Sequence, residues 1–229
     1  MTDPILHHAG PSGAGARLGA AMIHGRGAGA HDILGLLGAV GLPDIAAAAP
    51  EAPGASWWPT SFLAPASQMA PFVTRGLHAV EAAFSALEAE GVPSKRIALI
   101  GFSQGACLAL EYAARSERTI HSVYGLSGGL VGTCDKPARD KAELYGFDDK
   151  SFDYASDLSG LPIYLGCHES DPHIPLKRVQ DTERALSDLG ASVSLEIMSG
   201  HGHGVTQADV TALRAGLNGA ASLSSAAPS

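Results

Sequence analysis

Short, continuously apolar runs alternate along the chain with longer segments whose apolar residues recur at helical spacing. The apolar runs predict buried strands, and the amphipathic segments predict helices. Alternation of this kind, with strands that are apolar throughout, is typical of an α/β fold with a mostly parallel central sheet and helices on both faces. The predicted strands are 17–24, 44–52, 96–102, 119–128, 161–168 and 192–198, and the predicted helices are 31–41, 68–90, 105–116, 176–190 and 206–219.

Two segments interrupt this alternation. Residues 54–65 (GASWWPTSFLAP) form a loop rich in Pro and aromatic residues, and residues 133–160 are charged, aromatic and aperiodic. Such a stretch between regular elements is typical of an insertion or lid loop. We therefore treat 133–160, the insertion segment, as part of a single domain and not as a domain of its own.

The single domain is expected to span residues 1–229, with a core at about 17–218. The tail 219–229 is small and polar and is expected to be flexible. Near the other end, the pair His7 and His8 is expected to lie in a solvated terminus.

Composition narrows the classes of protein. Hydrophobic residues make up 45% of the chain and charged residues 17%, enough for a full core. The formal net charge of −8, with no basic run, argues against a nucleic-acid partner. Three cysteines without a CxxC pair favour a reducing compartment. With no signal-like start and no apolar run of about 18 residues, we expect a cytoplasmic protein without membrane insertion. The sequence leaves a homodimer open.

Two segments match G-x-S-x-G, in which a Ser stands in a sharp turn between a strand and a helix. Ser103, in GFSQG, directly follows the predicted strand 96–102 and precedes a helical run. Such a turn lifts the hydroxyl out of the sheet. Ser127, in GLSGG, also ends a strand, but no helix follows it. The pattern favours Ser103 as a nucleophile and Ser127 as a tight-turn residue.

A nucleophilic Ser needs a base and an acid that orients the base. Asp171 follows the strand 161–168, while His201 and His203 follow the strand 192–198. The carboxyl ends of parallel strands form the rim where α/β active sites lie, so these side chains are expected to meet Ser103 there. Two histidines in a glycine loop could also be surface residues or half of a metal site, but no metal-spaced cluster accompanies them. The competing acids are Glu169, Asp153 and Asp157.

The glycine turn MIHGRGAGA, residues 22–30, fits two chemistries. Its G-x-G-x-x-A spacing is that of dinucleotide-binding turns, and Glu51 stands near the place where such sites carry an acid. Alternatively, the turn aims the N–H of Arg26 at a developing oxyanion, with the N–H of Gln104 as the second donor. We prefer the hydrolase interpretation because it also uses the Ser, acid and His motifs.

Four segments together resemble the phospholipase/carboxylesterase family of α/β-hydrolases, which includes acyl-protein thioesterases and bacterial carboxylesterases. IHGRGA resembles its oxyanion segment, GFSQGA its nucleophile elbow, SDPHIPL its acid loop and MSGHGHGV its histidine loop. The resemblance runs from about Gly19 to about Leu217. The family's register, a His after Gly and before a small residue and an aliphatic one, selects His203. His201 stands where the family usually has an apolar residue. APEAPGASWWPTSF is similar to the bacterial carboxylesterase branch.

The resemblance implies an α/β-hydrolase fold without a large cap domain. It implies a serine carboxylesterase in which Ser103 attacks an ester, His203 takes the proton and Asp171 orients the imidazole. No metal and no cofactor is required. The short charged insertion favours small to medium esters. Acyl-protein thioesterase or lysophospholipase activity is the alternative within the family, and a non-catalytic binding module or a dinucleotide-binding oxidoreductase is the alternative from other classes.

The substrate pocket is expected to be apolar. Its candidate residues come from the aromatic loop and from the start of the insertion, although core packing explains each of them equally well. Phe102 is expected to be buried beside the nucleophile, and Phe147 to cover the pocket. The candidate lining residues are Trp57, Trp58, Phe62, Leu63 and Leu130.

Overall fold

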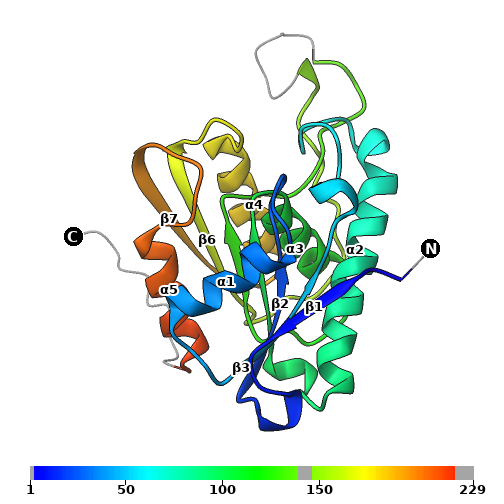
Figure 1. Cartoon of the computed structure of the whole chain (residues 1–229). Helices are drawn as coiled ribbons and strands as arrows, with labels where there is room; N and C mark the ends of the chain where they lie inside the picture. Colours follow the sequence, from blue (N-terminus) through cyan, green and yellow to red (C-terminus); the bar gives the residue numbers. More distant parts are fainter. Residues whose placement is uncertain (1–2, 139–145, 220–229) are drawn as a thin grey trace.

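The computed structural model describes residues 3–138 and 146–219, which build one seven-stranded sheet flanked by helices (Figure 1). The strand order is β1-β3-β2-β4-β5-β6-β7, and every neighbouring pair is parallel except β1 with β3. The strands are β1 (Leu6–Ala9), β2 (Leu18–Ile23), β3 (Ile45–Pro50), β4 (Ile97–Phe102), β5 (Val123–Leu126), β6 (Pro162–Ser170) and β7 (Ser192–His201). The α-helices are α1 (Ala30–Val40), α2 (Ala66–Ala89), α3 (Gln104–Arg115), α4 (Leu176–Asp188) and α5 (Gln207–Leu217).

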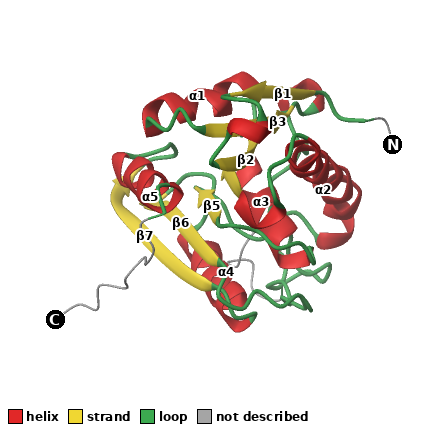
Figure 2. Cartoon of the chain, turned by 90° about the horizontal axis from the view of Figure 1, so that it is seen from below, coloured by secondary structure: helices red, strands yellow, loops and turns green. Residues whose placement is uncertain are grey.

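Helices cover both faces of the sheet, as predicted. Helices α1 and α5 lie on one face, and α2, α3 and α4 lie on the other (Figure 2). Alternate residues of a strand point to opposite faces, so each buried strand serves two cores. In β2, Ala20 and Met22 join the core under α1 and α5, whereas Ala21 and Ile23 join the core under α2, α3 and α4. This double coverage explains why the central strands β2, β3, β4 and β5 are almost wholly apolar.

The edge strand β1 was not predicted. His7 and His8, expected in a solvated terminus, are part of this strand, and His8 is exposed as expected. The two histidines pair with Ala49 and Ala48 of β3 in an antiparallel ladder. Backbone hydrogen bonds build this short strand, and its side chains carry no apolar run from which it could be recognised.

Two strands depart furthest from their predicted bounds. β7 continues to His201, three residues beyond the predicted end, because it pairs with β6 as far as Ser170 across a register shift. β5 is shorter than predicted and spans only Val123–Leu126. It ends because Ser127 turns the backbone to a φ of 52°.

The insertion segment is tied to α3 by a buried ionic cluster. Glu111 is fully buried, and one of its carboxylate oxygens accepts hydrogen bonds from Lys150 Nζ (2.9 Å), the Tyr154 hydroxyl (2.7 Å) and the Val131 N–H (2.8 Å). The other oxygen accepts one from Arg115 Nε at 2.6 Å. Burial alone would raise the pKa of Glu111, but the charges of Lys150 and Arg115 outweigh it and lower that pKa.

Replacement of Glu111 by Gln is expected to lower the free energy of unfolding by about 3–5 kcal/mol, because it leaves the Lys150 ammonium buried without its counter-charge. Urea denaturation at pH 7 measures the loss. Glu88→Gln is the matched control, since Glu88 pairs with Arg118 at a half-exposed site and should cost less than about 1 kcal/mol.

The native protein and the Glu111→Gln variant also allow a pH test of the ionic cluster around Glu111. A carboxylate whose pKa is lowered on folding stabilises the protein above its unfolded pKa, about 4.3 for Glu, and this contribution is lost as the pH falls through the folded value. The difference in stability between the native protein and Glu111→Gln should therefore shrink below about pH 4. Equal stability of the two proteins at pH 7 would show that the cluster contributes nothing.

Parts of the insertion segment and of the C-terminal tail are not among the described residues. Residues 139–145 of the insertion segment and 220–229 of the tail lie outside the described residues, so the single domain over 1–229 and the flexible tail stay predictions. Among the residues that are described, no helix combines the length and the apolar character needed to cross a membrane.

Candidate active site

Ser103 lies in the turn between β4 and α3, with a backbone conformation (φ 54°, ψ −119°) that residues other than Gly rarely adopt. The two glycines of its motif allow the chain to pass closely on both sides. A Cβ on Gly101 would lie 2.2 Å from the carbonyl oxygen of Gly105, and a Cβ on Gly105 would lie 2.0 Å from that of Ile23. The motif therefore contains glycine for steric reasons, and the strained turn lifts the hydroxyl above the sheet.

Three loops at the carboxyl ends of β4, β6 and β7 bring Ser103, Asp171 and His203 together. His203 Nε2 lies 2.9 Å from Ser103 Oγ, and His203 Nδ1 lies 2.8 Å from Asp171 Oδ2. An ionised carboxylate only accepts hydrogen bonds, so Nδ1 carries the ring proton and Nε2 is free to accept one from the serine hydroxyl. This tautomer is the one that a general base needs.

Asp171 is fixed by the backbone that follows it. Its second oxygen, Oδ1, accepts hydrogen bonds from the N–H groups of His173 (2.8 Å) and Ile174 (3.0 Å), and its side chain has no exposed surface. Burial alone would raise the pKa of Asp171, but the hydrogen bonds from His203 and from the two N–H groups lower it below the ordinary value. The carboxylate is therefore charged at neutral pH and its orientation is fixed.

The competing His and acid candidates have other partners. His201 Nδ1 lies 3.1 Å from the carbonyl oxygen of Ser170, and Glu169 accepts a hydrogen bond from the N–H of Gly200. The geometry therefore brings His203 to Ser103, and His201 does not take that place. The remaining candidate acids, Asp153 and Asp157, accept hydrogen bonds from Ser151 and Ser159 within the insertion segment.

Ser127 is held as a turn residue, in line with the prediction. It has a positive φ, and its N–H donates to the carbonyl oxygen of Gly166 at 2.7 Å. Its hydroxyl is buried and makes no hydrogen bond to any described residue, so no base is available to activate it.

The glycine turn packs directly against the elbow. A Cβ on Gly25 would lie 3.2 Å from the Cβ of Ser103. His24 Nε2 accepts a hydrogen bond from the N–H of Ala52, so Nδ1 carries a proton and donates it to the carbonyl oxygen of Gly25. These hydrogen bonds fix the turn in which Arg26 follows Gly25.

Gln104 has two features that bear on the site. As the first residue of α3, its backbone N–H has no acceptor within the helix. Its side chain accepts a hydrogen bond from the N–H of Trp57 (3.0 Å) and donates one to the carbonyl oxygen of Trp58 (2.9 Å). The side chain thus ties the elbow to the aromatic loop, a contact that no sequence pattern signals.

Glu51 argues against the dinucleotide interpretation of the glycine turn. Its Oε2 accepts a hydrogen bond from the N–H of Ala30 at 2.7 Å, at the start of α1. A dinucleotide-binding turn places the pyrophosphate at this helix N-terminus. A carboxylate of the protein itself occupies the position here.

A cavity of about 600 Å³ opens beside Ser103 and His203. Trp58, Phe62 and Leu63 line it, as expected for three of the five pocket candidates. The structure also brings to it residues that the sequence analysis missed: Cys107, which a spacing of one helical turn from Ser103 could have indicated, and Pro172, His173, Ile174 and Pro175, which follow the acid.

Two pocket candidates lie elsewhere. Trp57 turns away from the cavity, packs against the His24 ring at 5.1 Å between centroids and donates from Nε1 to the His24 carbonyl oxygen. Leu130 is fully buried in the core, with its N–H bonded to Thr182 Oγ1. Apolar side chains suit both a hydrophobic core and the wall of an apolar cavity. Hydrophobicity alone therefore could not tell which of the two places Trp57 and Leu130 would take.

Three further expectations concern the surroundings of the cavity. Phe102 is half-buried, and its ring lies 5.2 Å from the His203 ring. The described part of the insertion segment, Phe147 included, contributes no residue to the cavity lining. Burial raises the pKa of the Cys107 thiol to about 12, so this residue contributes a neutral surface.

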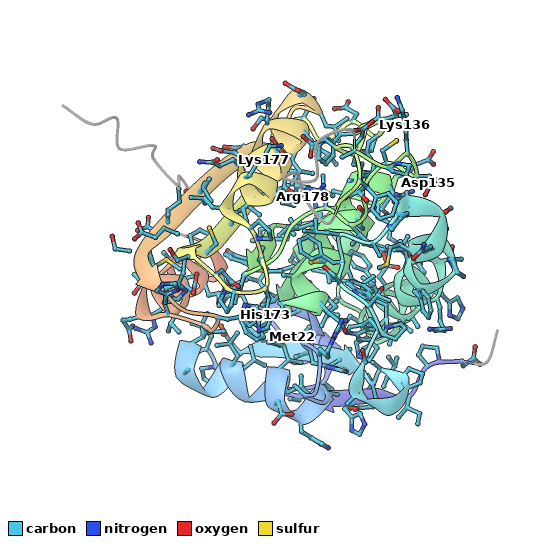
Figure 3. All side chains as sticks on the ribbon, turned by 90° about the horizontal axis from the view of Figure 1, so that it is seen from above. Met22, Asp135, Lys136, His173, Lys177 and Arg178 are labelled. Carbon is cyan, nitrogen blue, oxygen red and sulfur yellow. The ribbon has the colours of Figure 1, made fainter. Side chains whose placement is uncertain are left out.

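His173 completes the rim. Its ring meets the edge of the His203 ring at 4.8 Å between centroids and an angle of 78°. Figure 3 looks down on the molecule from above and labels His173 among the central side chains. Within residues 3–138 and 146–219, no group of three or more His, Cys, Asp or Glu side chains is arranged to hold a metal ion.

Comparisons with known proteins concern the family and the fold of the chain. A family model described as Phospholipase/Carboxylesterase matches residues 46–219. A phospholipase/carboxylesterase structure from Dyadobacter fermentans DSM 18053 is 31% identical, with a TM-score of 0.80, and the match covers 95% of this chain and 99% of that one.

More distant structures share the fold. A carboxylesterase from Mesorhizobium loti is 18% identical (TM-score 0.67, covering 90% of this chain and 92% of that one). The Bacillus cereus carboxylesterase is 14% identical (TM-score 0.68, covering 94% and 93%). No curated protein sequence matches the chain.

Proposed function

The chain belongs to the phospholipase/carboxylesterase family, and from this premise we propose that it is a serine carboxylesterase that hydrolyses small to medium carboxylic esters through Ser103, His203 and Asp171. The observation that carries the proposal is the continuous hydrogen-bond chain from the Asp171 carboxylate through the His203 imidazole to the Ser103 hydroxyl. A receptor or other binding module has no use for a hydroxyl aligned with a base in this way.

The proposed reaction begins with attack of Ser103 Oγ on the ester carbonyl while His203 Nε2 accepts the hydroxyl proton. Asp171 stays ionised and stabilises the imidazolium that forms. His203 then gives the proton to the leaving alkoxide, which departs as the alcohol. Water then attacks the acyl-enzyme while the same imidazole takes its proton, and the imidazolium returns that proton to Ser103 Oγ as the acid leaves.

The oxyanion of each tetrahedral intermediate needs hydrogen-bond donors. We assign this role to the backbone N–H groups of Arg26 and Gln104, which belong to the two segments that adjoin Ser103. Each such donor lowers the barrier by about 3 kcal/mol. Hydrogen bonds donated by the Gly27 N–H and by the His24 imidazole hold the first segment in place, and the helix holds the second. The donors therefore need no reorganisation during the reaction.

Two further features support the proposed substrate size and the proposed compartment. The cavity of about 600 Å³ lies within the usual range for small-molecule sites, which favours small to medium esters. Cys107, Cys134 and Cys167 are free thiols, which supports a reducing compartment such as the cytoplasm.

Labelling with a fluorophosphonate probe tests the proposal. The activated serine attacks the phosphorus and displaces fluoride, so we expect one stoichiometric label. Cleavage after Arg96 and Arg115 releases residues 97–115, in which Ser103 is the single serine, and mass spectrometry of this peptide assigns the label. Ser127→Ala should label like the native protein. A folded native protein that does not react, or that reacts at Ser127, would refute the proposed nucleophile.

A further inference from the structure

The charge of the cavity differs from the charge of the whole protein. The chain carries a formal net charge of −8, yet none of the described residues that line the cavity is an Asp or a Glu. Asp171 lies behind His203 and has no exposed side-chain surface. The lining contains one permanently charged side chain, that of Arg26, and a second group that can carry positive charge beside the base, His173.

The Arg26 guanidinium is held in place without being neutralised. Its Nη2 donates a hydrogen bond to the carbonyl oxygen of Thr60 in the aromatic loop. The salt bridges among the described residues engage other arginines and leave Arg26 without a carboxylate partner. Since a guanidinium has five N–H donors, most of its hydrogen-bonding capacity stays available to a ligand.

His173 is held from its backbone, which leaves its ring free to act on a ligand. Its N–H is bonded to Asp171, and its ring packs edge-on against His203. No hydrogen bond within the described part of the chain engages either nitrogen of this exposed ring. An imidazole offers at least one N–H donor in either charge state.

We propose that Arg26 and His173 bind a carboxylate carried by the substrate, so that the preferred substrates are small anionic esters. This inference rests on the proposed esterase function. A carboxylate matches the planar fork of a guanidinium, and charge-assisted hydrogen bonds of this kind are the strong ones. The apolar part of the ester would contact Phe62, Leu63 and Ile174 in the same cavity.

The carboxylate can belong to the acyl part or to the alcohol part of the ester, and two matched substrate pairs separate these sources. The acyl pair is 4-nitrophenyl hydrogen glutarate and 4-nitrophenyl pentanoate. The alcohol pair is 4-carboxyphenyl acetate and 4-carbamoylphenyl acetate. The ratio of kcat/KM for the anionic and the neutral member of each pair is measured at low and at high salt.

We expect the anionic member of at least one pair to be preferred by about tenfold or more, the size of one charge-assisted hydrogen bond. Salt should reduce the preference by screening. Arg26→Gln keeps the backbone N–H, and His173→Phe keeps the ring packing on His203, so each should reduce the anionic-to-neutral ratio. Lys95→Gln removes an exposed positive charge just before β4, at the opposite end of that strand from Ser103, and should leave the ratio unchanged.

The outcomes separate the two levels of the argument. Hydrolysis of the neutral esters with no preference in either pair overturns the anionic-ester inference and leaves the proposed function standing. The same holds if a preference is present but neither cavity variant reduces it. Absence of hydrolysis of all four esters by folded protein overturns the proposed function, and the inference with it.

Discussion

Replacement of Ser103 by Ala is expected to lower kcat for 4-nitrophenyl acetate by about 10⁴- to 10⁶-fold. The substitution removes the atom that forms the acyl-enzyme. Among the described residues His203 is hydrogen-bonded to no other hydroxyl, and Ser127 is buried without a base. Binding of the ester and the donors of the oxyanion hole remain, so a small residual rate above that in water is expected. Steady-state kinetics with saturating ester give kcat directly.

Ser103→Gly separates the chemistry of this residue from its backbone strain. At a φ of 54°, alanine keeps the strain that serine has, whereas glycine removes it. Both variants should be equally inactive, but the Gly variant should be more stable than the Ala variant by about 1–2 kcal/mol in thermal or urea unfolding. A folded Ser103→Ala variant with kcat within tenfold of the native value would contradict the assignment of the nucleophile.

The sharp strand–helix turn at Ser103, which causes this strain, could be predicted from the sequence. The strand before Ser103 and the helix after it both show in the hydrophobic pattern, and the flanking glycines meet a steric need that the coordinates explain. The parallel sheet and its rim were predictable for the same reason, because apolar strands and amphipathic helices alternate in order. Topology then places the ends of β4, β6 and β7 at one edge, where the three candidate side chains meet.

What could not be predicted depends on contacts without a local pattern. Strand β1 is made by backbone pairing, and the side chain of Gln104 acts through two hydrogen bonds to residues more than forty positions away. Trp57 and Trp58 are adjacent and equally apolar, yet only Trp58 reaches the cavity. The choice is made by the Trp57 indole N–H, which bonds to the His24 carbonyl oxygen. Side-chain direction within an irregular loop is set by such tertiary bonds.

The second large effect on kcat is expected at the acid that orients His203. Replacement of Asp171 by Asn is expected to lower kcat by about 10⁴-fold while the protein stays folded. The local structure predicts why an isosteric change is so damaging. The N–H groups of His173 and Ile174 point at Oδ1, so an Asn would keep its carbonyl oxygen there and turn its NH₂ group toward His203. That NH₂ donates a hydrogen bond, and Nδ1 must then accept it.

The proton of the neutral imidazole would move to Nε2, which could no longer accept the proton of the Ser103 hydroxyl. Glu169→Gln is the matched control, because Glu169 lies two residues away and accepts a hydrogen bond from the N–H of Gly200 instead of from His203. This variant should keep kcat within a few-fold of the native value. The two variants are compared by kcat for the same ester and by thermal unfolding. If Glu169→Gln were the inactive variant and Asp171→Asn the active one, the acid would be assigned to the wrong carboxylate. A loss of kcat in Asp171→Asn alone would instead show that the reactivity of His203 depends on its tautomer. Two backbone N–H groups determine that tautomer, because they fix which atom of residue 171 faces the imidazole.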